Sequence, residues 1–129
     1  MPILSPQSRE KLNTCHPDLQ TLVLEVAKQF DLTVVYGHRP EDQQEKAFKE
    51  GRSKVRWPNS KHNKMPSEAV DLAPYPIDWN DVRRFYYLAG YVRGVAERLG
   101  IKVRIGADWD GDFDIKDQNF HDLPHIELC

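Results

Sequence analysis

Residues 60–71 read SKHNKMPSEAVD and join a polar, proline-containing loop to a short apolar run. The apolar run continues over residues 69–73 and is closed by two prolines, which predicts a strand. Asp71 lies within this run, where an unpaired carboxylate would be costly to bury. His62 lies in the loop just before it. Because a loop that returns to a strand over this length can bring two side chains to one point, the stretch predicts a buried polar site.

Apolar residues at helical spacing predict two helices, one on either side of this stretch. The first begins at Pro17, because proline has no amide hydrogen to lose at the first helical position. Its core face comprises Leu19, Leu22, Val23, Val26, Ala27 and Phe30. The second helix can be capped by Asn80 and ends at Gly100. Its buried stripe comprises Val82, Phe85, Leu88, Ala89, Val92, Val95, Ala96 and Leu99.

One polar helix and several short strands complete the pattern. The helix is expected over residues 41–50, with Ala47 and Phe48 facing inward and Gly51 at its C-terminal cap. Further strands are predicted at residues 32–36, 101–105 and 126–128. No repeat or linker divides the sequence, so we expect a single domain over residues 1–129. Helices that precede and interrupt short strands predict an α+β fold with a small, mostly antiparallel sheet flanked by helices.

The composition excludes several classes of function. The chain is 40% hydrophobic and 29% charged, and its net charge of -2 gives no basic field for nucleic acid or an acidic membrane. No apolar run approaches the roughly 20 residues that cross a bilayer. Residues 1–10 lack the basic region and apolar core of a secretory signal. We therefore expect no nucleic-acid partner, no membrane anchor and synthesis in the cytoplasm without a signal peptide.

Three polar segments carry candidate metal-binding and catalytic residues. They are Gly37-His38-Arg39 with Gln44 after it, Ser60-Lys61-His62 with Asp71 after it, and Asp122-Leu123-Pro124-His125. Catalytic zinc usually takes three protein ligands and leaves a fourth position for water. His62, Asp71 and His125 satisfy that count, and two neutral imidazoles leave the ion enough positive charge to acidify its water.

Each candidate residue also has a simpler explanation. His62 alone fits a surface residue of a lysine-containing loop, and His125 alone fits a core histidine bonded to a backbone carbonyl. Asp122 could accept a proton near a metal-bound water, but it could equally brace the turn before His125. Arg39 could reach an oxyanion or form an ordinary surface salt bridge. Spacing alone leaves these alternatives open.

Taken together, the segments resemble a family of zinc peptidases. The family includes D-alanyl-D-alanine carboxypeptidases and dipeptidases and the L-alanyl-D-glutamate endolysins of phages. Its pattern has Ser-x-His before small-x-Asp, and an acid-x-x-His pair near the end, as at residues 60–62, 69–71 and 122–125 here. The Gly-x-Arg region matches residues 37–39, and Gly106-Ala107-Asp108-Trp109 resembles the Gly-x-Asp-Trp element. The matches keep the family order over residues 17–128.

This resemblance implies a set of roles. His62, Asp71 and His125 are expected to bind zinc, and Asp122 to be the catalytic base. Arg39 is expected to bind substrate and stabilise the tetrahedral intermediate. Ser60 and Gln44 are the further candidates for substrate binding. The fold that the resemblance implies is the small α+β one shared with the zinc-binding domain of hedgehog signalling proteins.

Two features favour the phage branch of this family. The segment between His62 and Asp71 is longer than the glycine-containing turn of many members, and it resembles a phage subgroup of L-alanyl-D-glutamate peptidases. The base position holds Asp122, where D-alanyl-D-alanine enzymes tend to have glutamate. We therefore expect a monomeric phage endolysin that hydrolyses the peptidoglycan stem peptide and acts on the cell wall after release. A D-alanyl-D-alanine carboxypeptidase is the alternative.

Two other classes of function compete with a peptidase. A non-catalytic zinc-binding module would need neither Asp122 nor Arg39. A metal-dependent nuclease built on His38, His62 and His121 would suit a more basic chain than this one.

An acidic loop also suggests a cation site, with aspartates at positions 108, 110, 112 and 114. It fails the EF-hand pattern, because Phe113 occupies the glycine position and Asn119 the closing glutamate position. A looser regulatory cation site in this loop stays open.

Overall fold

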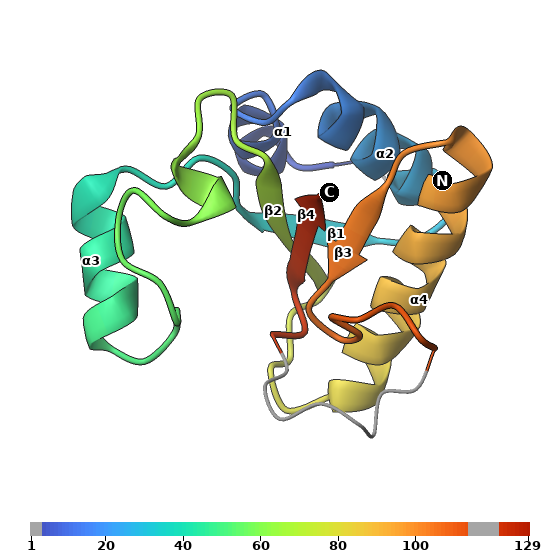
Figure 1. The fold of residues 1–129 in the computed structure, drawn as a ribbon. Coiled ribbons are helices and arrows are strands. Elements are labelled where there is room, and N and C mark those ends of the chain that lie inside the picture. Colours follow the sequence, from blue (N-terminus) through green and yellow to red (C-terminus); the bar gives the residue numbers. More distant parts are fainter. Residues whose placement is uncertain (1–3, 114–121) are drawn as a thin grey trace.

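An antiparallel sheet of four strands, in the order β1-β2-β4-β3, forms the centre of the molecule (Figure 1). The structure is a computed structural model that describes residues 4–113 and 122–129. The described strands are β1 (Leu32–Tyr36), β2 (Ala69–Pro74), β3 (Val103–Ile105) and β4 (His125–Leu128). The described helices are α1 (Pro6–Leu12), α2 (Pro17–Ala27), α3 (Glu41–Lys49), the 3-10 turn η1 (Lys61–Asn63) and α4 (Val82–Leu99). The α+β fold with a small antiparallel sheet is thereby confirmed.

The central strand β2 is buried at every residue. It pairs with β1 on one side and β4 on the other, and β3 joins the sheet through β4. The register places Asp71 of β2 opposite His125 of β4. Two polar residues far apart in sequence are therefore neighbours on adjacent strands.

Helices α2 and α4 pack against each other, and α4 also contacts β2 and β3. The predicted apolar faces of both helices are largely buried. Their apolar residues recur at helical spacing, so they share the side of each helix that faces the core. Gly100 ends α4 with a positive φ of 75°, a conformation that glycine adopts without steric cost. Among the described helices, none has the length and apolar character needed to cross a membrane.

Several local predictions were wrong. Asp81 caps α4 in place of Asn80, since its carboxylate accepts from the backbone N–H of Arg84. Val82 and Leu99, the first and last residues of the helix, are 44% and 38% exposed. The third predicted strand begins at residue 103, not 101.

Helix α1 was not predicted, although Ser5 caps it and Pro6 occupies its first turn. It contacts β1, where the Ser8 hydroxyl accepts from the backbone N–H of Val34 at 3.0 Å. At seven residues the helix is too short to show an apolar stripe. Only its cap and proline could have indicated it.

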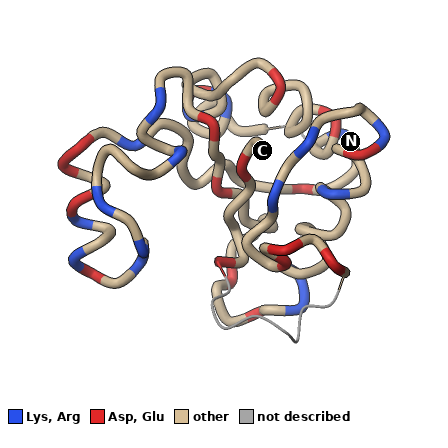
Figure 2. The backbone as a smooth tube through the Cα atoms, viewed as in Figure 1, with Lys and Arg blue, Asp and Glu red and all other residues tan. Residues whose placement is uncertain are grey.

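Helix α3 and the loop that follows it form a lobe, residues 41–60, that stands away from the sheet (Figure 1). Charges of both signs lie along this lobe (Figure 2). Ala47 faces inward as predicted, but Phe48 is 41% exposed and lies beneath the guanidinium of Arg56. The backbone N–H of Arg39 donates to the carbonyl of His62 and ties the segment just before the lobe to η1.

Candidate metal centre

The three predicted metal ligands lie together, and two of them, His62 and His125, line a cleft. Nε2 of His62 is 3.2 Å from Oδ1 of Asp71, and Nδ1 of His125 is 3.3 Å from the same oxygen. One donor atom of each residue lies within 4.8 Å of the other two. All three side chains are buried. The structure thus brings together residues that spacing alone could not join.

Local structure fixes each of these positions. Ser60 caps η1, and its hydroxyl accepts from the backbone N–H of His62 at 3.2 Å. Asp71 and His125 are cross-strand partners in the sheet. A turn, a central strand and its neighbour therefore each supply one donor.

The outer nitrogen of each histidine ring donates to a fixed acceptor. Nδ1 of His62 donates to the carbonyl of Gly37 at 2.8 Å, and Nε2 of His125 donates to Oε1 of Glu127 at 2.8 Å. The inner nitrogens, Nε2 of His62 and Nδ1 of His125, then face Asp71. This is the arrangement that orients metal-binding histidines and raises their basicity.

Gly37 is required where it lies. A Cβ at this position would overlap the carbonyl oxygen of Lys11 and the hydroxyl of Thr14. The absence of a side chain lets the backbone approach α1, which brings the Gly37 carbonyl into reach of His62.

The ionisable side chains of this cluster strongly shift one another's pKa values. Burial opposes ionisation of Asp71, but the neighbouring imidazoles of His62 and His125 hold its pKa far below the usual range. Burial also opposes protonation of His125, yet hydrogen bonds to Asp71 and Glu127 raise its pKa to about 9. In the absence of metal, a proton on His125 therefore compensates the buried carboxylates.

Glu127 is a further candidate site residue that was not predicted from the sequence. Its carboxylate is buried beside His125 and is flanked by Nζ of Lys61 at 3.7 Å and Nε of Arg104 at 3.5 Å. Burial alone would raise its pKa, but the hydrogen bond from His125 lowers it. Alternation along a strand puts residues 125 and 127 on one face, and that pattern could have indicated it.

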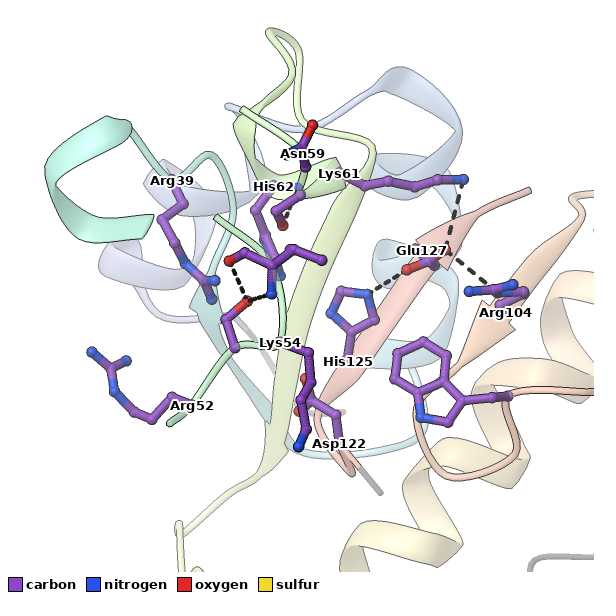
Figure 3. Close-up of a pocket in the computed structure, with 14 residues that line it drawn as sticks. Arg39, Arg52, Lys54, Asn59, Lys61, His62, Arg104, Asp122, His125 and Glu127 are labelled. Atoms are coloured by element: carbon purple, nitrogen blue, oxygen red, sulfur yellow. Dashed lines mark hydrogen bonds and ion pairs between the residues drawn. The ribbon is translucent and has the colours of Figure 1, made fainter. Parts of the chain in front are cut away.

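Asp122 lines the same cleft as His62 and His125 (Figure 3). Its backbone carbonyl accepts from the N–H of His125 at 3.0 Å, and its own N–H donates to the carbonyl of Gly106. Burial and the nearby charge of Asp71 raise its pKa to about 6. A carboxyl with that pKa exchanges protons readily near neutral pH.

Arg39 is buried and holds the far side of Asp71. Its Nη2 lies 3.4 Å from Oδ2 of Asp71, and its Nη1 donates to Oε1 of Gln44 at 3.0 Å. Its Nε has no hydrogen-bond partner among the described residues. Arg39 lines the cleft as well, so its positive charge lies next to both the candidate ligands and the open space.

Gln44 lies beneath the cleft, with 0% of its surface exposed. Its oxygen accepts from Arg39 and Asn63, and its amide nitrogen donates to Ser53 and to the carbonyl of Val55. These contacts are all to the protein. Substrate binding by Gln44 stays a prediction, and its burial favours a supporting position instead.

The remaining candidates divide between this cleft and other regions. Ser60 lines the cleft. His38 lies outside the donor cluster found among the described residues, and His121 of the competing nuclease hypothesis lies outside the described residues.

The acidic loop holds a second group of carboxylates. Oxygen atoms of Asp108, Asp110 and Asp112 approach within 4.8 Å of one another, whereas residue 114 lies outside the described residues. Asp108 accepts from Arg93 and from the backbone N–H of Phe113 through Oδ2. The cation site suggested by the sequence stays a prediction.

The cleft above the candidate ligands has a volume of about 410 Å³. Its lining includes Lys54 and Asn59 of the lobe, Arg104 of β3, and Trp109. Two buried histidines that line an open cleft, with a buried aspartate beside them, are the donor set of a metal-dependent hydrolase.

Comparison with known proteins identifies the family. The chain belongs to the phage L-alanyl-D-glutamate peptidase family, whose model matches residues 3–129. It is 35% identical to the L-alanyl-D-glutamate peptidase of Escherichia phage T5, over 94% of this chain and 93% of that protein. Its fold is similar to that of the Serratia marcescens L-Ala D-Glu endopeptidase ChiX, with a TM-score of 0.75 and 26% identity. That match covers 98% of this chain and 90% of ChiX. The resemblance inferred from the motifs is confirmed, and the chain is a peptidase.

Proposed function

We propose that this chain is a zinc-dependent peptidase that hydrolyses the L-alanyl-D-glutamate bond of the peptidoglycan stem peptide. The observation that carries the proposal is the convergence of His62, Asp71 and His125, two of which, the histidines, line an open cleft. Family membership and two similar proteins named for this activity support the choice of bond. We further propose that residues 1–129 form one catalytic domain, which acts as a monomer on the bacterial cell wall after release from the host cytoplasm.

The donor chemistry fits zinc. Two imidazole nitrogens and one carboxylate oxygen are ligands that zinc accepts, and three protein donors are the count of a catalytic site. Both histidines have their outer N–H groups held by acceptors, so their inner nitrogens are oriented before any ion arrives. When bound, zinc would act as a Lewis acid on the scissile carbonyl and lower the pKa of a water molecule toward roughly 7.

Asp122 is assigned as the general base and then the general acid. Its raised pKa, about 6, leaves it ionised at neutral pH and still basic enough to accept a proton from the attacking water. The same proton then passes from its carboxyl group to the departing amine of the D-glutamyl residue. The chain therefore supplies its own route for the proton that peptide hydrolysis must move.

Arg39 is assigned two tasks that its position allows. Its Nη2 holds the outer oxygen of Asp71, which orients the carboxylate toward the histidines. Its charge also stabilises negative charge that develops on the substrate in the cleft. Gln44 supports Arg39 from below, and the hydroxyl of Ser60 can donate to the substrate while its oxygen accepts from His62.

Two variants test this assignment on isolated cell walls and on a synthetic stem peptide, with products identified by mass spectrometry. His125→Ala should lose zinc and activity together. Asp122→Asn should keep zinc and lose about 10²–10⁴ of the turnover rate. Asp42→Asn, an exposed carboxylate on α3, is the matched control and should behave as wild type. Wild-type turnover by Asp122→Asn would reject the base, and release of terminal D-alanine alone would reject the bond.

A further inference from the structure

A second cavity, of about 460 Å³, adjoins the cleft. Arg39, Arg52 and Asp122 line both spaces, and the second cavity also reaches Asp71. Its volume lies within the roughly 300–1,000 Å³ that small-molecule pockets have. A substrate bound at the catalytic residues can therefore extend into this cavity as well as into the cleft.

Trp79 lines the second cavity, and 56% of its surface is exposed. One face of its indole is stacked on Phe85, with ring centroids 5.3 Å apart and ring planes 20° from parallel. Phe85 itself is buried in α4. The stacking covers one face of the indole, and the exposure of the side chain leaves the other face accessible. Trp79 thus offers a flat apolar surface in a cavity that the catalytic residues share.

Hydrogen bonds hold the segment that carries Trp79, which connects β2 to α4 (Figure 1). The guanidinium of Arg84 on α4 donates to the backbone carbonyls of residues 75 and 76, at 3.0 and 3.2 Å. The carboxylate of Asp78 accepts from the backbone N–H of Asn80 at 3.0 Å. Because the backbone is held on both sides of Trp79, the indole is in position before any ligand arrives, which lowers the entropic cost of a contact.

Trp109 is an aromatic side chain of the cleft itself, but its ring already has neighbours. Its centroid is 5.4 Å from that of the His125 ring, and the guanidinium of Arg104 lies 5.5 Å from it. These contacts place Trp109 among the groups that surround a candidate ligand. Trp79 is therefore the better candidate for a contact with substrate.

The proposed substrate carries a sugar close to the scissile bond. In peptidoglycan the alanyl residue is amide-linked to the lactyl group of an N-acetylmuramic acid residue of the glycan strand. The alanyl residue and the lactyl group each span about 3.5 Å, so the sugar begins roughly 7 Å from the scissile carbonyl. On the other side of that bond the stem continues as peptide. The sugar must therefore lie beside the catalytic residues, on the alanyl side.

We propose that the second cavity binds this sugar, with one face of its pyranose ring packed against the indole of Trp79. This inference rests on the proposed peptidase function. A pyranose ring presents C–H groups on its faces, and such groups pack well on the electron-rich face of an aromatic ring. Tyr36 and Arg52 of the same lining place polar groups near the sugar's hydroxyl and acetamido groups. The stem peptide then runs from the second cavity, past the candidate ligands, into the cleft.

Two soluble substrates isolate the contact with the sugar. Both contain the L-alanyl-D-glutamyl bond and a lactyl group on the alanyl nitrogen, and only one carries N-acetylmuramic acid as the source of that lactyl group. For the wild-type zinc enzyme, kcat/KM should be about 3–10-fold higher with the sugar, the size of one aromatic contact. Trp79→Leu should bring this ratio near one, because leucine still covers Phe85 but has no flat face. Trp79→Phe should keep most of the ratio.

Trp57→Leu is the matched control. Trp57 is 41% exposed on the lobe and lines neither the cleft nor the second cavity. This variant should keep the wild-type ratio. Each ratio compares two substrates on one enzyme, so a partial loss of zinc or of folded protein cancels. A purely structural role of Trp79 would lower both rates together and leave the ratio unchanged.

The outcomes are distinct. A wild-type enzyme that cleaves neither substrate rejects the proposed function, and this inference with it. A wild-type enzyme with equal kcat/KM for the two substrates rejects this inference and leaves the function intact. A Trp79→Leu variant that retains the wild-type ratio rejects Trp79 as the residue that binds the sugar.

Discussion

Replacing Glu127 by glutamine is expected to weaken zinc binding without removing any ligand. In the native protein Oε1 of Glu127 accepts from Nε2 of His125 at 2.8 Å in a buried position. Glutamine keeps the size and one acceptor oxygen, but it removes the negative charge that makes the imidazole a better donor. Changes of this kind typically lower metal affinity 10- to 100-fold, or about 1.4–2.7 kcal/mol.

The pH of the measurement affects how much of this loss is seen. The pKa of His125 is raised to about 9 despite burial, partly by Glu127, so a proton competes with zinc at neutral pH. The glutamine variant lowers that pKa and relieves the competition, which offsets part of the loss near pH 7. At pH 9 the offset shrinks, and the full loss of affinity should appear.

The assay is a competition for zinc with a chromophoric chelator, at pH 7 and pH 9, alongside NMR titration of the His125 ring in the metal-free protein. Glu97→Gln, an exposed carboxylate on α4, is the matched control. Affinity within twofold of wild type at both pH values, with an unchanged His125 pKa, would show that Glu127 does not tune this histidine.

Three further results are expected. Gly106→Ala should lower turnover with zinc retained, because the new Cβ would overlap the carbonyl of Asp122 and displace it; unchanged kcat and zinc content would refute this. Metal-free protein should lose on the order of 3 kcal/mol of stability as the pH rises from 6.5 to about 9. Burial lowers the pKa of His125, but hydrogen bonds to Asp71 and Glu127 raise it to about 9. The stabilisation of the folded state by protonated His125 is therefore complete below pH 6.5 and is lost above pH 9. Denaturant unfolding of the apo protein measures it, and His125→Gln should remove the pH dependence. Ser8→Ala should cost about 1–3 kcal/mol, because it leaves the buried N–H of Val34 without its acceptor; a midpoint equal to wild type would exclude this.

Local signals were sufficient to predict the longer elements. Pro17 occupies the first turn of α2, Gly100 follows the last turn of α4, and both helices show apolar residues at helical spacing. These features act within one or two turns of chain, so they can be read without knowledge of the fold. Helix α1 packs against β1 and accepts a hydrogen bond from it through Ser8, and contacts between distant residues have no local signature.

The site was predictable as a set of motifs, but its geometry was not. Nothing near Asp71 or His125 specifies that they are opposite each other, because that register comes from strand pairing between distant segments. Gln44 shows the same limit. Its burial depends on Arg39, Asn63 and the loop around residue 55, which no pattern within a polar helix reveals.

The order of strands in the sheet has a consequence for how the protein is made. β4 is inserted between β2 and β3, so β3 can join the sheet only after residues 125–128 have been synthesised. The same strand carries His125, the third proposed ligand. Until it leaves the ribosome, a nascent chain lacks both the docked edge strand and the complete donor set. The sheet and the proposed donor set therefore depend on the same last strand, so we expect partly synthesised chains to lack peptidase activity in the cell that makes them.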